Sequence, residues 1–189
     1  MRIISGLKKG HTILSYKNKE VRPLTNKNRE TIFNLLTHGK EIMSTGFGIE
    51  NSVILDLFAG TGSFSFEALS RGASKATVVE NSTIMIDLIY KNTEKLKFKD
   101  KIVICEENAC SFTVNSSDPK FDLVYCDPPY EKKLGIRSLK NLVKKNMLNH
   151  NAIIVMEEEL KAKPINLPEL EILRIKEIGI SKFSFLRLL

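Results

Sequence analysis

From residue 52 onward, short apolar runs alternate along the chain with stretches of helical periodicity. Helical patterns at Ser63 to Arg71, Ile84 to Leu96 and Ile136 to Met147 separate these runs. The alternation predicts an α/β fold, in which helices cover a mainly parallel sheet. Two further apolar segments near the end of the chain flank Gly179 and predict an antiparallel hairpin. The predicted strands are Val53 to Phe58, Ala76 to Glu80, Ile102 to Cys105, Phe121 to Asp127, Ala152 to Met156, Glu171 to Ile178 and Lys182 to Leu188.

The first 40 residues follow a different pattern. Apolar alternation around two early glycines predicts a short β-hairpin, and the segment from the N-cap Thr25 to His38 predicts a helix. A chain of 189 residues suits one domain with a single core. We therefore expect one domain, residues 1–189, in which a basic extension (1–40) precedes the α/β core (41–189).

Several classes of protein are disfavoured by what the sequence lacks. No apolar run approaches the roughly 20 residues of a membrane span, and the start does not resemble a signal peptide. The three cysteines form no C-x-x-C pair, and the three histidines have no metal-ligand spacing. We expect a cytoplasmic protein that uses neither a disulfide framework nor a metal.

The net charge of +7 comes from one end of the chain. Residues 1 to 29 hold eight Lys and Arg side chains against Glu20 alone, whereas residues 30 to 189 are balanced. Such an excess is expected of a segment that contacts phosphates, because each neutralised phosphate releases a counterion. A solvated, lysine-rich start is the alternative. The basic residues are Arg2, Lys8, Lys9, Lys17, Lys19, Arg22, Lys27 and Arg29.

A glycine-containing loop follows the first predicted strand of the core, in the sequence Asp56-Leu57-Phe58-Ala59-Gly60-Thr61-Gly62-Ser63. Glycines at this place let a backbone approach a ligand at the carboxyl end of a strand. Ser65 stands where a dinucleotide fingerprint has its third glycine, and no G-K-[ST] follows. The loop therefore favours neither a nicotinamide cofactor nor a P-loop, and alone it is compatible with a structural turn.

Polar residues also follow the next two predicted strands. Glu80 ends the second strand, where a carboxylate can accept hydrogen bonds from the hydroxyls of a ribose. Asn108 and Ala109 follow the third strand, and the Asn108 amide offers the donor and acceptor that recognition of an adenine edge needs. A surface carboxylate at Glu80 and a turn or helix cap at Asn108 are the structural alternatives.

The most specific motif is Asp127-Pro128-Pro129-Tyr130, which ends the fourth predicted strand. We name these four residues the catalytic turn. The lone pair of an aromatic amine is delocalised into its ring, so hydrogen bonds from the amine to the Asp127 carboxylate and the Pro128 carbonyl would make it a better nucleophile. Two prolines hold that carbonyl rigidly, and Tyr130 offers a ring on which a flipped base can stack.

Together these motifs resemble class I methyltransferases with a D-P-P-Y motif and, within them, the RsmD-like family of 16S rRNA guanine-N2 methyltransferases. The resemblance extends over nearly the whole chain, and its N-terminal part distinguishes the family from other methyltransferases. It rests on Met1 to Gly6, Arg22 to Thr25, Arg29 to Leu35, Asp56 to Ser63, Glu67 to Ala73, Glu80 and Asp127 to Tyr130.

The resemblance implies a Rossmann-like seven-stranded sheet with an antiparallel last strand. It also implies S-adenosylmethionine as cofactor and, as acceptor, guanine N2 of 16S rRNA within a small-subunit assembly particle. The catalytic turn would face the guanine. The cofactor pocket would comprise Asp56, Phe58, Ala59, Gly60, Gly62, Glu80, Asn108 and Ala109, and the residues that guide RNA would be Arg2, Lys8, Lys9, Arg22 and Arg29. The chain departs from the pattern at Asn108, where many relatives of the wider class carry aspartate, and at Leu24.

Other interpretations stay open at this point. The same motif would serve a DNA methyltransferase acting on adenine N6 or cytosine N4, or a protein-glutamine methyltransferase, and a non-catalytic RNA-binding assembly factor could retain the fold. After the motif, basic residues recur at roughly helical spacing as either a second phosphate contact or a solvated helix face. They are Lys133, Arg137, Lys140 and Lys144.

Overall fold

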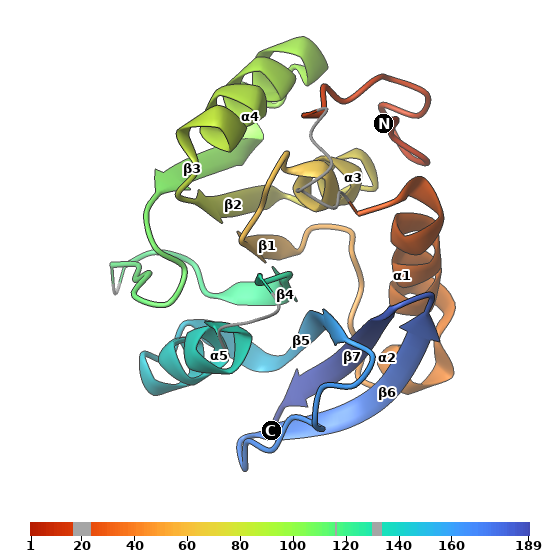
Figure 1. The fold of residues 1–189 in the computed structure, drawn as a ribbon, viewed down its shortest axis with the longest axis vertical. Coiled ribbons are helices and arrows are strands. Elements are labelled where there is room, and N and C mark those ends of the chain that lie inside the picture. Colours follow the sequence, from red (N-terminus) through yellow and green to blue (C-terminus); the bar gives the residue numbers. More distant parts are fainter. Residues whose placement is uncertain (17–23, 116, 130–133) are drawn as a thin grey trace.

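A computed structural model describes residues 1–16, 24–115, 117–129 and 134–189. Its strands are β1 (Val53–Leu57), β2 (Lys75–Glu80), β3 (Ile102–Glu106), β4 (Phe121–Cys126), β5 (Leu148–Glu159), β6 (Leu170–Ile178) and β7 (Ser181–Leu188). These seven strands of the described residues form one sheet, in the order β3-β2-β1-β4-β5-β7-β6 (Figure 1). β1 to β5 pair in parallel, whereas β7 is antiparallel to both β5 and β6. The mainly parallel sheet with a reversed last strand is confirmed.

Helices cover the two faces of this sheet unequally. The helices are α1 (Asn26–His38), α2 (Lys40–Met43), α3 (Ser63–Ser70), α4 (Thr83–Leu96) and α5 (Leu134–Lys144), with a short 3-10 turn at Lys99–Lys101. Side chains of α1 to α4 pack into one hydrophobic core on one face of the sheet. A second core on the other face contains side chains of α5 and of residues 109–121. The molecule therefore has a three-layer α/β architecture.

Local sequence accounts for these elements. The Thr25 hydroxyl accepts a hydrogen bond from the backbone N–H of Asn28 at 3.1 Å, which caps α1 as predicted. Every residue of α3 is buried, because this helix lies between the sheet and the N-terminal residues. In β1, Ile54 belongs to one core and Leu55 to the other, so the strand is apolar on both sides.

The N-terminal segment, residues 1–16, is less regular than the predicted hairpin. It makes one isolated β-bridge, between Arg2 and Thr12, and is held by turn hydrogen bonds instead of two regular strands. At its tip Gly6 has a φ of +79°, and a Cβ there would lie 1.8 Å from the carbonyl oxygen of Ser70. The tip therefore packs against the end of α3 so closely that only glycine fits.

Other differences from the predicted elements concern their ends and number. α5 begins two residues earlier than expected and ends at Lys144, and β5 begins at Leu148, four residues before the predicted strand. The four-residue α2 was not predicted, and the described residues between β3 and β4 contain no helix. None of the helices in the described ranges has the length and apolar character needed to cross a membrane.

Candidate active site

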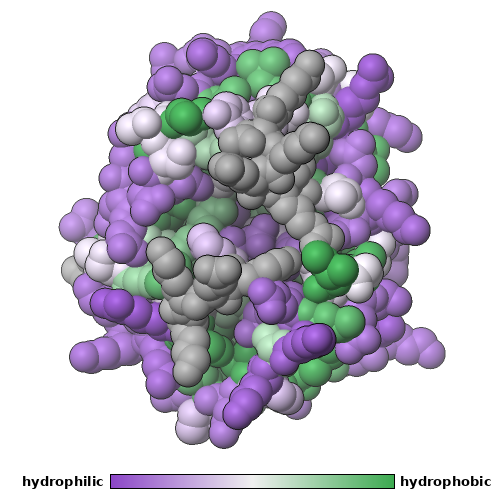
Figure 2. Space-filling view, in the orientation of Figure 1, coloured by the Kyte–Doolittle hydropathy of each residue, from purple (hydrophilic) through white to green (hydrophobic). Residues whose placement is uncertain are grey.

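The candidate site lies at the carboxyl ends of β1, β2 and β4. β1 is flanked by β2 on one side and by β4 on the other, and the helices that follow β1 and β4 lie on opposite faces of the sheet. Connections that leave a sheet in opposite directions open a crevice between them, which is where α/β sheets bind ligands. Figure 2 shows a recess near the middle of this view, where Figure 1 labels β1 and β4.

Residues 58–62, which we name the glycine loop, form one wall of this crevice. Phe58, Gly60 and Gly62 all have positive φ values, of 60°, 55° and 72°. A Cβ at Gly62 would lie 2.9 Å from the ring of Phe66, whereas a Cβ at Gly60 would meet nothing within 4 Å. Gly62 is therefore required by packing against α3. Gly60 leaves open space beside the backbone, as expected of a loop that a ligand approaches.

Glu80 holds the glycine loop from the end of β2. One oxygen of its carboxylate accepts a hydrogen bond from the backbone N–H of Gly60 at 2.8 Å. The other oxygen accepts from the N–H groups of Asn81 and Ser82, both at 2.9 Å. A carboxylate has about four acceptor positions, so three are in use and about one remains for a ribose hydroxyl. Glu80 is thus more than a surface carboxylate, because it shapes the loop itself.

Asp56 is a buried carboxyl group two positions before the loop, with 1% of its surface exposed. Its Oδ2 accepts hydrogen bonds from the Ser65 hydroxyl at 2.8 Å and the Ser65 N–H at 3.3 Å. Its Oδ1 has no hydrogen-bond partner among the described residues. Burial raises the pKa of Asp56 to about 7, against the lowering effect of Ser65 and with a further increase from the Glu80 charge. The Asp56 carboxyl group is therefore about half protonated near pH 7 and has one buried oxygen without a partner among the described residues.

The structure places Asn108 at the start of a turn. Its amide oxygen accepts a hydrogen bond from the backbone N–H of Cys110 at 2.8 Å, and its carbonyl accepts from the N–H of Ser111 at 3.0 Å. The side chain is exposed, so its NH₂ group can still face a ligand. Ala109 is buried in the core beside α5. The turn alternative is thus observed, and an adenine contact stays a prediction.

The catalytic turn begins directly beside the glycine loop. The backbone N–H of Asp127 donates to the carbonyl of Leu57 at 3.4 Å, which extends the pairing of β4 with β1 by one residue. Asp127 is partly exposed, Pro128 is buried and Pro129 is exposed. Tyr130, predicted to stack on the base, lies outside the described residues. The structure therefore brings together the two motifs that the sequence separates by about 65 positions.

The two residues before Asp127 stay protonated near neutral pH. Burial raises the pKa of the Tyr125 hydroxyl and of the Cys126 thiol well above their usual values, and the Asp127 charge raises both further. Tyr125 also stacks on Phe64, with ring centroids 4.2 Å apart, and donates to Glu157 at 2.7 Å. Neither group can act as a base there. The role of Asp127 as hydrogen-bond acceptor for the substrate amine stays a prediction.

The tip that carries Lys8 and Lys9, two predicted RNA-guiding residues, lies far from the glycine loop. The Lys8 N–H donates to the Ser70 hydroxyl at 2.9 Å, at the end of α3 opposite to the loop. α3 has eight residues, which corresponds to about 10 Å along its axis. Arg2 and Lys9 are exposed, and the Lys8 ammonium lies 5.9 Å from the ring centroid of Phe98. Arg22 lies outside the described residues.

Arg29 corrects a prediction, because its side chain is 0% exposed and so cannot contact RNA in this structure. Its Nη2 donates to the carbonyl of Arg2 and, at 3.0 Å, to the side chain of Asn26. Its Nε lies 3.5 Å from the carboxylate of Glu67. Burial lowers the pKa of Arg29 and the Glu67 charge opposes this effect. Arg29 anchors the N-terminal segment from within.

Glu67 and Asn92 are structural partners of this segment that sequence analysis did not single out. Glu67 accepts hydrogen bonds from the backbone N–H groups of Ile4 at 2.8 Å and Ser5 at 3.0 Å. The fully buried Asn92 amide pairs with the N–H and carbonyl of Leu14, at 2.7 and 3.0 Å, and lies 3.4 Å from the carbonyl of Thr61. In each helix a polar residue stands among the apolar residues of the buried stripe. This pattern was the signal in the sequence that could have identified Glu67 and Asn92.

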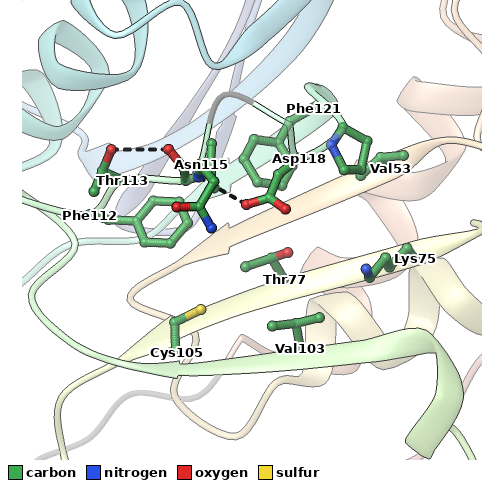
Figure 3. Close-up of a pocket in the computed structure, with 12 residues that line it drawn as sticks. Val53, Lys75, Thr77, Val103, Cys105, Phe112, Thr113, Asn115, Asp118 and Phe121 are labelled. Atoms are coloured by element: carbon green, nitrogen blue, oxygen red, sulfur yellow. Dashed lines mark hydrogen bonds between the residues drawn. The ribbon is translucent and has the colours of Figure 1, made fainter.

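A separate pocket of about 270 Å³ lies on the face of the sheet that also carries α5 (Figure 3). It reaches the first residues of β1 and β2, and neither the glycine loop nor the catalytic turn lines it. Burial raises the pKa of its Cys105 thiol, so that thiol is a poor nucleophile. Its lining residues are Val53, Lys75, Thr77, Val103, Cys105, Phe112, Thr113, Val114, Asn115, Asp118, Pro119 and Phe121.

Known proteins are similar to this chain in both sequence and architecture. A ribosomal RNA small subunit methyltransferase D from Haemophilus influenzae is 33% identical, with 97% of this chain and 91% of the relative covered. An uncharacterised methylase from Rickettsia prowazekii is 34% identical, with 99% of this chain and 97% of the relative covered. The solved structure of a candidate methyltransferase from Escherichia coli has a TM-score of 0.83 and 27% identity, and covers 100% of this chain and 97% of its own.

A solved candidate methylase from Haemophilus influenzae is also similar, with a TM-score of 0.79 and 32% identity over 100% of this chain and 98% of its own. The family described as Conserved hypothetical protein 95 matches residues 1–187. The match includes the N-terminal segment, the glycine loop and the catalytic turn. The chain therefore belongs to this family, that of the RsmD-like methyltransferases.

Proposed function

We propose that this chain transfers a methyl group from S-adenosylmethionine to the exocyclic N2 amino group of a guanine in 16S rRNA, within a small-subunit assembly particle. The relatives named ribosomal RNA small subunit methyltransferase D support rRNA methylation. The observation that carries the proposal is the meeting of two loops at one crevice. There the Asp127 N–H donates to Leu57, directly before the glycine loop.

The residues at the crevice fit this cofactor. S-adenosylmethionine supplies an electrophilic methyl group on a sulfonium, together with an ammonium group, a ribose and an adenine. The unpaired Oδ1 of Asp56 is an acceptor for a cation, and open space beside Gly60 leaves room for the ligand. The remaining acceptor position of Glu80 suits a ribose hydroxyl, and the Asn108 NH₂ group suits an adenine edge.

In the catalytic turn, Asp127 and Pro128 would act on the acceptor amine. The Asp127 carboxylate would accept one N–H of the guanine amine and the Pro128 carbonyl the other, which draws the nitrogen lone pair out of the ring. Two consecutive prolines keep this carbonyl rigid. Methyl transfer then depends mainly on alignment of the donor with the acceptor and on exclusion of water. The proton that the methylated amine releases passes to Asp127 or to solvent.

Transfer of label from S-adenosylmethionine tests this proposal. The purified chain is incubated separately with immature small subunits, naked 16S rRNA, DNA and a glutamine-containing peptide, and the products are digested to nucleosides or amino acids. We expect N2-methylguanosine from an RNA arm only. Methylated adenine or cytosine from DNA, or methylated peptide, would contradict the proposal and identify a different acceptor. If the chain binds RNA but transfers no methyl group to any of the four substrates, it would be a non-catalytic assembly factor.

Replacement of the catalytic carboxylate tests the role of the turn. Asp127→Asn should lower methyl transfer by about 100-fold or more, because general acid–base and hydrogen-bond contributions are typically of this size. Cofactor affinity, measured by calorimetry, should stay unchanged, because the proposed contact is with the acceptor. Asp100→Asn, at an exposed carboxylate of the 3-10 turn before β3, is the matched control. An equal loss of cofactor affinity would remove Asp127 from the acceptor side.

A further inference from the structure

α5 carries an exposed basic face on the side of the sheet opposite to α1 and α3. Arg137, Lys140 and Lys144 are exposed, and their spacing of three and four residues places them on one side of the helix. Ser138, Leu139 and Leu142 are buried on the other side. We name Arg137, Lys140 and Lys144 the basic face of α5. Figure 2 shows hydrophilic residues over the lower left of this view, where Figure 1 places α5.

These cations lie in a segment of the chain that contains no acidic residue. From residue 134 to residue 156 the chain contains four Lys and Arg residues, with Lys145 as the fourth, and no Asp or Glu. None of the ion pairs among the described residues involves the basic face of α5. Like charges three or four residues apart on a helix repel one another. A polyanion would relieve this repulsion, whereas burial of α5 against the sheet does not.

The start of α5 is locked onto the catalytic turn. A Cβ at Gly135 would lie 2.6 Å from the end of the Met156 side chain and 3.1 Å from the ring of Pro128, so the helix backbone approaches the catalytic turn closely at this glycine. With a rise of about 1.5 Å per residue, Arg137 lies about 3 Å beyond Gly135 along the helix axis, and Lys144 about 14 Å. The basic face of α5 therefore begins beside the catalytic residues and leads away from them.

We propose that the basic face of α5 binds the phosphates of the RNA strand that flanks the target nucleotide. This inference rests on the proposed function, and it adds an RNA contact on the face of the sheet opposite to the N-terminal segment. Its cations follow one line from the catalytic turn, as a strand leaving the crevice would. Arg137 is nearest to the turn and has the planar guanidinium that can hold a phosphate by two hydrogen bonds, so it contributes most.

RNA affinity measured over a range of KCl concentrations tests the proposal. We compare Arg137→Gln/Lys140→Gln/Lys144→Gln with a control, Lys75→Gln/Lys97→Gln/Lys101→Gln, which removes three exposed lysines at or near the amino ends of β2 and β3. The probes are naked 16S rRNA and immature small subunits. The α5 variant should lose at least tenfold in affinity, and its salt slope should fall by about 2, since each contact to single-stranded RNA contributes about 0.7.

Single variants and cofactor binding make the result decisive. Arg137→Gln should weaken RNA binding more than Lys144→Gln, and all variants should bind cofactor as the parent chain does. An α5 variant with the same affinity and salt slope as the control would overturn the proposal. If the parent chain binds RNA but methylates no arm, the proposed function fails, while the comparison of salt slopes still decides the role of α5.

Discussion

Glu67 and Asp56 are both buried carboxyl groups, but their surroundings differ. Glu67, on α3, accepts three hydrogen bonds, from two backbone N–H groups and Arg71, and lies beside the buried Arg29. Asp56, on β1, receives hydrogen bonds only from Ser65, and one of its oxygens has no partner among the described residues. Both lie within segments on which the family resemblance rests.

This difference suggests different roles for the two groups: Glu67 holds the fold together, whereas Asp56 can bind a ligand. In a buried carboxylate whose two oxygens both have partners, the cost of desolvation is compensated within the protein. A buried acceptor without a partner costs free energy unless a ligand supplies the missing group. We therefore interpret Glu67 as the anchor of the N-terminal segment and Asp56 as part of the cofactor site.

The largest effect is expected from removal of the structural charge. Glu67→Ala should lower the free energy of unfolding by about 3 to 5 kcal/mol, because it leaves Arg29 buried without its carboxylate. Chemical denaturation measures this loss. The double variant Glu67→Gln/Arg29→Met removes both charges and should lose less. Equal losses in the single and double variants would show that pairing is not the reason.

The pH dependence of stability should report the burial of the Asp56 carboxyl group. Folding raises the pKa of Asp56 from 3.8 to about 7, so between these values the folded state holds a proton that the unfolded state has released. The contribution of Asp56 to stability is therefore full below about pH 4 and is lost as pH rises to about 7. Relative to Asp56→Asn, the parent chain should lose about 2 kcal/mol between pH 5 and pH 7. Parallel stability curves from chemical denaturation would contradict this.

Cofactor affinity should respond to Asp56 and not to Glu67. Asp56→Asn should weaken binding of S-adenosylmethionine by about tenfold or more, because a charge-assisted hydrogen bond becomes a neutral one. Calorimetry at pH 8, where Asp56 is ionised, measures the change. Glu67→Gln is the matched control and should bind cofactor normally at a temperature where it is folded. A weaker affinity in the control alone would reverse the two assignments.

The smallest effect is expected at the exposed tip that Glu67 helps to hold. Lys8→Glu/Lys9→Glu should weaken binding to 16S rRNA and make its salt dependence shallower, with unchanged stability and cofactor affinity. Titrations at several KCl concentrations measure both quantities. Because this tip lies about one α3 length from the glycine loop, its loss should affect RNA affinity more than the rate of transfer from bound RNA. An unchanged salt slope would remove the tip from the RNA interface.

The strands, most helices and both motifs of the candidate site were predictable from local sequence. Apolar runs identify buried parallel strands, and Thr25 caps α1 as its hydroxyl side chain suggests. The glycines at 60 and 62 adopt positive φ values, as a tight loop at a strand end requires. These features depend on residues within a few positions of one another, so the sequence alone specifies them.

Contacts between distant segments were not predictable in this way. A basic residue in a basic region was expected to face RNA, yet Arg29 is buried because Glu67 lies beside it in the fold. Likewise, a hairpin was expected where the N-terminal segment instead packs its backbone against α3. Whether a charged side chain is exposed depends on the partner that the fold places beside it. The residues next to it in the sequence do not identify that partner.

By itself the sequence determined the chemistry that the chain can offer: a loop with room for a ligand, a rigid acidic turn and an excess of positive charge at one end. Only the tertiary structure decided which groups meet. The order of the strands places β1 beside β4, which joins the loop to the turn, and the packing of α3 leaves Asp56 with one unpaired oxygen. The reason is that strand pairing and burial are long-range contacts, whereas propensity, charge and backbone freedom belong to each residue.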